Sequence, residues 1–214
     1  MLLRCENISK SIGGKVILNN ISFSIQRNTI NFIIGPNAAG KTSLGRIIAG
    51  YDDDYTGKLF NEARDSQQFV PNVIKINSYL PLSVMDFIQL FDGFNVNDIS
   101  DFICFDSIVN KQLSELSAGQ LHKLFLVVSL SISSLLIVFD EPTSTLDPVS
   151  CNKFFLLLKK YINVTFIVIS HDLHMVSSFA DQVICINKHI CCVKSIDCKS
   201  TDFIRYYHQH DHEH

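Results

Sequence analysis

The chain has 214 residues, an apolar content of 47% and a formal net charge of −3. This length is enough for one well-buried core, or for a core with a small subdomain, and the apolar content excludes a mainly disordered chain. The net charge is slightly negative, whereas nucleic-acid binding normally needs a basic face, so we expect no nucleic-acid partner.

The beginning of the chain shows no secretory signal, because Arg4, Glu6 and Lys10 follow the first three residues. The longest uncharged stretch, residues 124–139, contains four serines. It is shorter than the roughly 20 apolar residues of a bilayer span. We therefore expect a buried helix end followed by a buried strand, and a chain that lies on a membrane rather than in it.

The first third of the chain predicts two strands and a helix around a glycine loop. Apolar residues alternate with serines over 21–25, which is typical of a strand with one exposed face. Residues 30–34 are almost all apolar, as in a strand buried on both faces. Residues 35–40 are a loop, and 41–49 have a helical pattern that Gly50 can end.

The rest of the chain predicts a helical insertion followed by alternating elements. Residues 72–127 have few strand signals, with helices expected over 84–91 and 121–130. Then come a strand over 135–139, a helix over 150–161, a strand over 165–169, a helix over 173–179, and a hairpin of 183–186 with 190–193. This alternation indicates an α/β protein with a mainly parallel sheet covered on both faces.

Residues 35–42 fit the phosphate-loop pattern G-x-x-x-x-G-K-[ST]. The candidate binding residues are Gly35, Pro36, Asn37, Ala38, Ala39, Gly40, Lys41, Thr42 and Ser43. Backbone N–H groups of such a loop surround a phosphate, and the following helix adds a favourable dipole. Lys41 is expected to reach the β- and γ-phosphates, and the Thr42 hydroxyl to ligate Mg²⁺. A chance glycine turn is the alternative, but the flanking strand and helix favour nucleotide binding.

Two carboxylates stand at the end of the apolar strand predicted over 135–139. Asp140 suits Mg²⁺, which prefers oxygen ligands. Glu141 follows and is expected on the opposite face of the strand end. Alone, the pair could be a solvated turn; beside a phosphate loop, a role in nucleotide chemistry is favoured.

Residues 116–120 read Leu-Ser-Ala-Gly-Gln and precede a predicted helix. Ser117 is a candidate helix cap, and the backbone of Gly119 lies near the helix start. A helix N-terminus can bind an anion. A capping motif without a ligand is the alternative.

Taken together, the phosphate loop, residues 116–120 and Asp140-Glu141 resemble the ATP-binding cassette (ABC) ATPases. The resemblance covers nearly the whole chain. It implies a P-loop NTPase of ABC type, with an antiparallel β part near the N-terminus and a helical subdomain inserted before the signature segment. The division it implies is an ABC ATPase domain over 1–207, with a core of 1–71 and 128–207 and a helical subdomain of 72–127, followed by a histidine-rich tail over 208–214.

The resemblance also assigns roles around ATP and Mg²⁺. Asp140 would ligate the Mg²⁺, and Glu141 would polarise the attacking water as general base. His171, which follows the strand over 165–169, resembles the switch histidine that contacts the γ-phosphate. A lone histidine after a strand is more often a surface residue, but its place after the Asp-Glu strand favours the switch role.

In this family two copies of the chain sandwich two ATP molecules, so a homodimer is implied in the ATP state. Ser117, Gly119 and Gln120 of the signature segment would then face the nucleotide held by the partner copy. Residues 144–147 resemble the family's D-loop, which lines the dimer seam.

Three positions depart from the family pattern. Ile12 stands where an aromatic residue usually stacks on adenine. Asn72 stands where a glutamine usually approaches Mg²⁺ and the attacking water; it is one methylene shorter, and Gln67 or Gln68 could replace it only if the loop shifts. Ala38 replaces a glycine, so we expect some strain or a different turn, because alanine tolerates a positive φ less well.

A narrower resemblance, to the ATPase subunit of bacterial high-affinity zinc importers, rests on residues 80–84, 170–174, 183–192 and the tail. It implies an integral membrane permease subunit, a periplasmic or extracellular metal-binding protein, and a cytoplasmic location on the inner face of the cell membrane. The alternatives are an ABC ATPase for manganese, iron or haem, a soluble ABC-type ATPase without a permease, and a nucleotide-binding module with little hydrolysis.

The chain ends in alternating histidines, His208, His210, His212 and His214. In an extended segment all four project to the same side, and imidazole suits Zn²⁺, so the tail is a candidate metal site. A solvated tail with weak metal affinity is the alternative. Cys191, Cys192 and Cys198 with His189 fit no standard zinc spacing, so we expect them to serve packing.

Overall fold

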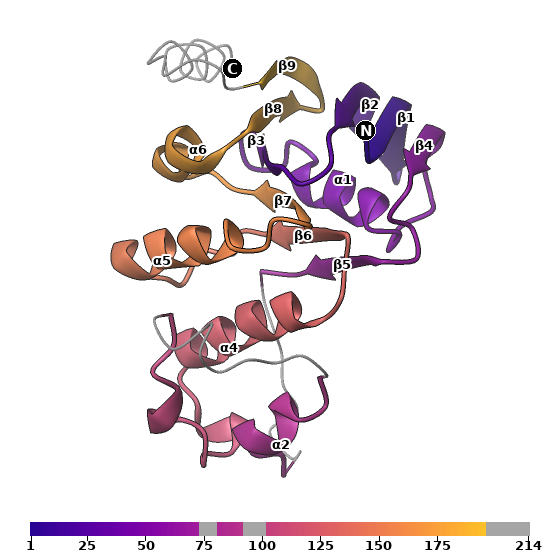
Figure 1. Ribbon diagram of the computed structural model, residues 1–214. Helices are drawn as coiled ribbons and strands as arrows, with labels where there is room; N and C mark the ends of the chain where they lie inside the picture. The colour runs from indigo at the N-terminus through magenta and orange to yellow at the C-terminus, as the bar shows by residue number, and fades with distance from the viewer. Residues whose placement is uncertain (73–80, 92–101, 196–214) are drawn as a thin grey trace.

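The computed structural model describes residues 1–72, 81–91 and 102–195. It contains a small sheet beside a larger one (Figure 1). The small sheet is antiparallel, in the order β2-β1-β4. Its strands are β1 (Leu3–Ile12), β2 (Lys15–Ile25) and β4 (Thr56–Asn61).

The large sheet has the order β5-β6-β7-β3-β8-β9. Its strands are β3 (Ile30–Ile34), β5 (Gln67–Val70), β6 (Leu136–Asp140), β7 (Thr165–Ile169), β8 (Gln182–Asn187) and β9 (His189–Ser195). All neighbours are parallel except β8 and β9, which form the antiparallel hairpin. The predicted mainly parallel sheet is therefore confirmed.

Helices lie on both faces of the large sheet. The α-helices in the described ranges are α1 (Lys41–Ile48), α2 (Val84–Ile88), α4 (Ala118–Ser131), α5 (Pro148–Leu158) and α6 (Leu173–Phe179). Figure 1 shows α1 beside the small sheet, and α4, α5 and α6 on the opposite side of the large sheet. Within the described ranges, no helix has the length and apolar character that a bilayer crossing requires.

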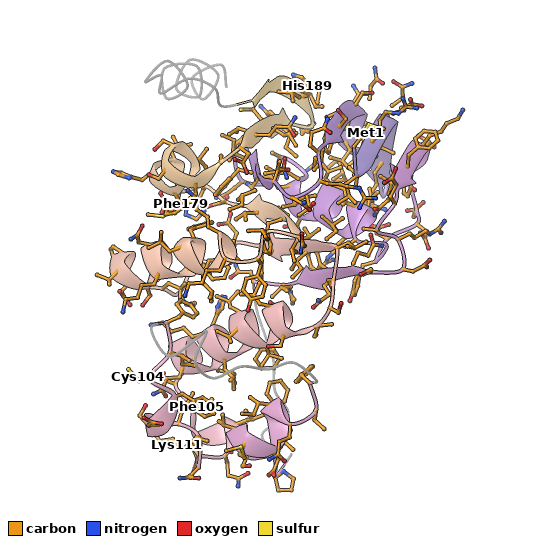
Figure 2. The ribbon with its side chains drawn as sticks, in the orientation of Figure 1. Met1, Cys104, Phe105, Lys111, Phe179 and His189 are labelled. Atoms are coloured by element: carbon orange, nitrogen blue, oxygen red, sulfur yellow. The ribbon has the colours of Figure 1, made fainter. Side chains whose placement is uncertain are left out.

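The core is divided in two by the large sheet. Phe32 points into the core on the side of the later helices, where it contacts Phe155 of α5 at a ring distance of 5.5 Å. Phe179 of α6 stacks on the same ring at 5.1 Å (Figure 2). Ile33, the next residue of β3, packs on the other side with Leu44 of α1. This alternation explains why β3 is apolar except for Asn31: both faces are buried.

The predicted bounds hold for the strands over 30–34 and 165–169 and for the helix over 173–179. The helix predicted over 84–91 is shorter, because the backbone tightens after Ile88 into i→i+3 bonds. The helix predicted over 150–161 begins earlier, at Pro148, and ends at Leu158 for the same reason. The division into core and helical subdomain stays a prediction.

Candidate nucleotide-binding site

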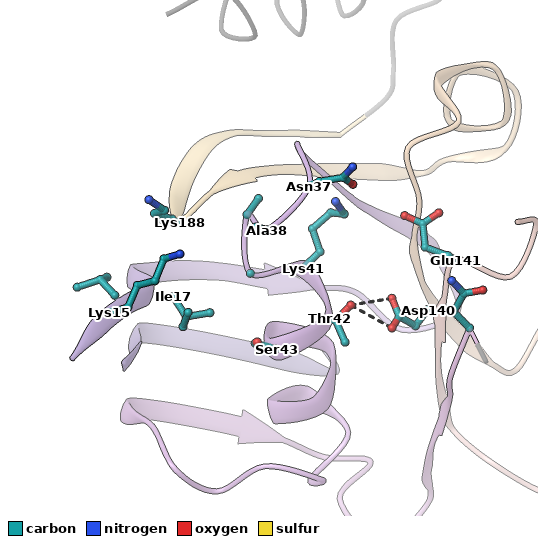
Figure 3. Close-up of a pocket in the computed structure, with 14 residues that line it drawn as sticks. Lys15, Ile17, Asn37, Ala38, Lys41, Thr42, Ser43, Asp140, Glu141 and Lys188 are labelled. Atoms are coloured by element: carbon teal, nitrogen blue, oxygen red, sulfur yellow. Dashed lines mark hydrogen bonds between the residues drawn. The ribbon is translucent and has the colours of Figure 1, made fainter. Parts of the chain in front are cut away.

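A cavity of about 380 Å³ lies where the loop after β3 meets the ends of other strands (Figure 3). Of the predicted residues, the loop and helix start over 37–43 line it together with Asn72, Asp140 and Glu141. Four further lining residues were not predicted: Lys15, Val16 and Ile17 of β2, and Lys188 of the β8–β9 turn. Lys15 and Lys188 lie at the end of the cavity away from Glu141 (Figure 3).

Two glycines allow the loop to fold tightly. A Cβ on Gly35 would lie 2.0 Å from the Ile186 carbonyl oxygen of β8, so no other residue fits there. Gly40, at the N-cap of α1, has φ 94°, which favours glycine. Ala38 also has a positive φ, 62°, so the turn keeps a glycine-like backbone despite the side chain, as the strain argument predicts.

Lys41 is held on the inner side of the loop. Its Nζ donates to the carbonyl oxygens of Gly35, at 2.8 Å, and Pro36, at 2.9 Å. Gly35 and Pro36, the two predicted loop residues that do not line the cavity, thus contribute to the site through their carbonyl groups. Burial lowers the pKa of Lys41, and the nearby Glu141 and Asp140 oppose this effect. A cation with its position fixed in this way is suited to phosphate oxygens.

Thr42 and Asp140 bring oxygen atoms together from α1 and the end of β6. The Thr42 Oγ1 donates to the Asp140 carboxylate, at 3.0 Å from each oxygen (Figure 3). Burial raises the pKa of Asp140, and the bond from Thr42 counteracts it. A buried carboxylate beside a hydroxyl is an oxygen donor set that fits a hard cation such as Mg²⁺.

Glu141 and His171 come together although they are far apart in the sequence. The Glu141 Oε2 lies 2.8 Å from the His171 Nδ1; the glutamate side chain is 17% exposed and the histidine 69%. The two atoms are close, but Oε2 has no partner with hydrogen-bond geometry among the described residues. The expectation that Glu141 faces away from Asp140 is wrong: β6 ends at Asp140 and Glu141 has φ 51°, so strand alternation stops and both carboxylates line the cavity.

The signature segment does not line this cavity. The Ser117 Oγ accepts the Gln120 N–H at 3.2 Å, and the Gln120 side chain accepts the Ser117 N–H at 3.0 Å, so the predicted cap is confirmed. The helix begins directly after Ser117, earlier than the predicted residue 121, because this reciprocal pair satisfies its first N–H groups. Ser117 is exposed and Gly119 half-buried.

Residues 144–147 contact both the cavity and α4. The Ser144 Oγ donates to the Asn72 Oδ1 at 2.6 Å. The Thr145 Oγ1 lies 2.9 Å from the Nδ1 of His122, a residue that the sequence reasoning did not single out. His122 is 5% exposed, its Nε2 has no hydrogen-bond partner among the described residues, and burial lowers its pKa. Such an unpaired buried group costs about 1–3 kcal/mol. Nothing in the local sequence marks His122 as buried, because Lys123 follows it directly.

Asn72 occupies the predicted position at the cavity edge, and the two glutamines before it make other contacts. The Gln67 side chain accepts a bond from Asn61, and the Gln68 Nε2 donates to the Ser129 carbonyl at 3.2 Å. In this conformation both glutamine side chains are therefore bound elsewhere, which agrees with the expectation that either could replace Asn72 only if the loop shifts. Ile12 is 55% exposed and is not among the lining residues; Val16 and Ile17 supply the apolar surface instead.

The candidate metal residues near the C-terminus remain predictions. His208, His210, His212, His214 and Cys198 lie outside the described residues, and the side chains of Cys191 and Cys192 are also outside them. Within the part of the chain that the structure describes, no group of three or more His, Cys, Asp or Glu could hold a metal ion. Cys5 is buried, and burial raises its pKa to about 12, as expected of a packing residue.

Comparison with solved structures agrees with this fold. A structure described as the ATP-binding subunit of an ABC transporter has a TM-score of 0.81 at 16% identity, covering 97% of this chain and 94% of that one. A nucleotide-free ATP-binding cassette from an ABC transporter has a TM-score of 0.76 at 19% identity, covering 97% and 95%. At these identities the likeness shows the P-loop ABC fold and nothing more.

Comparison of sequences adds the family. The family model described as ABC transporter matches residues 18–144. The zinc import ATP-binding proteins ZnuC of Rickettsia bellii and Rickettsia conorii are 36% and 34% identical, each over 100% of this chain and 98% of the relative. The chain belongs to the ABC transporter family of ATPases.

Proposed function

We propose that the chain is the ATP-hydrolysing subunit of an importer that energises zinc uptake through a separate membrane permease. The observation that supports the chemistry is the meeting, in one cavity, of the Lys41 ammonium, the Thr42–Asp140 pair and the Glu141 carboxylate. The observation that supports the cargo is the name that both Rickettsia relatives carry, since the alignments span the whole chain.

The proposed chemistry assigns one task to each group. Backbone N–H groups of the phosphate loop and the Lys41 ammonium bind the β- and γ-phosphates. Glu141, whose side chain is mostly buried and whose Oε2 has no hydrogen bond among the described residues, accepts a proton from the attacking water. His171, 2.8 Å from that oxygen, orients the carboxylate and approaches the γ-phosphate. Thr42 and Asp140 would hold Mg²⁺, which would neutralise developing charge on the phosphates.

A second copy of the chain would complete each site. Ser117, Gly119 and Gln120 stand at the N-terminus of α4, away from the cavity of their own chain. The capping box occupies the N–H groups of Ser117 and Gln120, whereas those of Ala118 and Gly119 have no acceptor within the helix. Such an exposed helix start suits an anion, and we assign that anion to the γ-phosphate bound by the partner copy. Dimerisation would then depend on ATP.

The membrane partners follow from the same proposal. The dimer would dock beneath an integral membrane permease, on the cytoplasmic face of the cell membrane, and a periplasmic or extracellular metal-binding protein would deliver the cargo. The alternating histidines over 208–214 are a candidate Zn²⁺ site within this assembly.

The test is ATP hydrolysis by the chain reconstituted with its permease in lipid vesicles. Adding the metal-binding protein loaded with Zn²⁺ should stimulate hydrolysis, whereas the Mn²⁺-loaded protein should not, and Glu141→Gln should remove the activity in both cases. Equal stimulation by the two metals would contradict the zinc assignment. Hydrolysis that survives in Glu141→Gln would contradict the role of Glu141.

A further inference from the structure

We infer that His122 and Thr145 are positioning residues that hold the D-loop, residues 144–147, against the signature helix α4. The two segments that would face the partner copy then form one unit. This inference rests on the proposed two-chain site, and it adds residues to which neither the sequence pattern nor the comparisons give a role.

The first support is the contact itself. His122 lies in the first turns of α4, five residues after the Ser117 cap, and its Nδ1 is 2.9 Å from the Thr145 Oγ1. The backbones are also close here, since a Cβ on Gly119 would lie 3.9 Å from the Thr145 carbonyl oxygen. The contact therefore joins the D-loop to the part of α4 that carries the signature segment.

Lys123, the next residue of α4, provides a second link to the far end of the D-loop. Its Nζ donates to the Ser150 Oγ at 2.6 Å and lies 3.7 Å from the Asp147 carboxylate. Asp147 in turn caps α5 by accepting the Ser150 N–H at 2.9 Å. The D-loop is therefore tied to α4 at Thr145 and at Asp147, and it cannot move alone without breaking one of these contacts.

A third contact connects this unit to the nucleotide cavity. The Ser144 Oγ donates to the Asn72 Oδ1, and Asn72 lines the cavity beside Asp140 and Glu141. A displacement at the cavity edge is thus passed to the D-loop, and through Thr145 and His122 to the signature helix. Within one chain these contacts form a continuous path from its own nucleotide cavity to the signature helix that would face the partner's nucleotide.

The unpaired nitrogen of His122 distinguishes a positioning role from simple packing. Nε2 is buried and has no hydrogen-bond partner among the described residues, while Nδ1 contacts Thr145. An apolar side chain in this place would fill the core without leaving a polar atom unpaired. The feature that requires an imidazole is therefore the contact with Thr145.

The consequence for activity is specific, because neither His122 nor Thr145 lines the cavity. Loss of their contact should leave ATP binding by one chain intact and weaken the steps that need both chains. The variants are His122→Ala, Thr145→Val and the double substitution, with His122→Gln as the conservative exchange whose amide can still meet Thr145. Thr56→Val, at an exposed threonine of β4, is the matched control.

Three quantities are measured on the full chain: affinity for a fluorescent ATP analogue, kcat for ATP hydrolysis, and ATP-driven dimerisation in a Glu141→Gln background by light scattering. We expect His122→Ala and Thr145→Val each to lower kcat about tenfold and to weaken dimerisation. ATP affinity should stay within about twofold. The double variant should be no worse than either single one, because both remove the same contact. His122→Gln should recover most of the activity, and Thr56→Val should match the wild type.

The inference is overturned if both single variants keep the wild-type kcat, if their effects multiply in the double variant, or if ATP affinity falls in parallel with kcat. A Glu141→Gln chain that stays monomeric in ATP would instead refute the proposed two-chain site. If that chain dimerises, and does so equally well with His122→Ala, only the positioning role fails.

Discussion

Ala38 shows how a single residue limits the phosphate loop. Its φ of 62° lies in the left-handed region, where a Cβ is unfavourable, yet the loop still places Lys41 and Thr42 in the cavity. The strain is local and is offset by the neighbouring contacts, such as the Lys41 bonds to the Gly35 and Pro36 carbonyls. The alanine therefore adds strain to the loop, while Lys41 and Thr42 still line the cavity.

Ala38→Gly should stabilise the chain. Glycine relieves the positive φ but adds freedom to the unfolded chain, so we expect a net gain of at most about 1 kcal/mol in the free energy of unfolding. Urea denaturation measures this change in the free energy of unfolding. Ala39→Gly is the matched control: Ala39 is 2% exposed and has no positive φ, so the same change should destabilise. A loss of stability in Ala38→Gly would show that the Ala38 side chain makes a compensating contact.

At the scale of elements, α4 has two functions at one end. The Ser117–Gln120 capping box begins the helix, and the N–H groups between its two ends, those of Ala118 and Gly119, are proposed to face the partner's γ-phosphate. Stability and activity thus depend on the same residue, but they respond differently to charge. A carboxylate can cap a helix as well as a hydroxyl does, whereas it repels a phosphate.

Substitutions of Ser117 should separate these functions. Ser117→Asp should keep the free energy of unfolding within about 0.5 kcal/mol and should abolish ATP-driven dimerisation in the Glu141→Gln background. Ser117→Asn introduces a side chain equal in size to aspartate but uncharged, so it should keep the cap and weaken dimerisation less than Ser117→Asp does. Ser117→Ala should lose about 1 kcal/mol of stability. Chemical denaturation and light scattering measure the two effects. Dimerisation of Ser117→Asp as strong as that of the parent would contradict the anion-facing role.

The elements that the sequence pattern predicted best are those buried on both faces. β3 and β7 are apolar except for Asn31 and Thr165, and every residue in them is buried. β1 was missed because shifts in its register break the period of two. β4 and β5 are edge strands with polar or exposed residues, such as Thr56 and Gln67, so their pattern gives no clear strand signal.

The residues of the candidate site also fall into two groups, those that the sequence predicted and those that only the structure shows. The phosphate loop and Asp140-Glu141 could be predicted because each motif is contiguous and its spacing carries the chemistry. The His122–Thr145 contact and the position of Lys188 could not, because each depends on how distant segments pack. Glu141 was placed on the wrong face because a positive φ after a strand end has no signature in its own residue type.

At the scale of the whole molecule, two of the three buried side-chain atoms without a hydrogen bond in the described residues lie at the proposed site or at the D-loop. Among the described residues the three atoms are Asn31 Oδ1, His122 Nε2 and Glu141 Oε2. Asn31 lies on β3, the strand that leads into the phosphate loop, and the other two lie at the D-loop contact and in the cavity. The two apolar cores on either side of the large sheet must offset these unpaired groups.

His122 makes the stability of the whole chain depend on pH. Burial lowers its pKa in the folded state below the 6.5 of an unfolded chain, so folding favours the neutral imidazole. Its contribution should be complete above pH 6.5 and should be lost as the pH falls from there toward the folded pKa, because the unfolded chain then binds the extra proton. The free energy of unfolding changes through this one group by at most about 1.4 kcal/mol per pH unit.

Urea denaturation at several pH values should therefore show the wild type losing stability faster than His122→Gln below pH 6.5. Because both proteins share every other titrating group, the difference between their curves isolates His122. Parallel curves across this range would mean that the imidazole of the folded protein accepts a proton as easily as that of the unfolded chain.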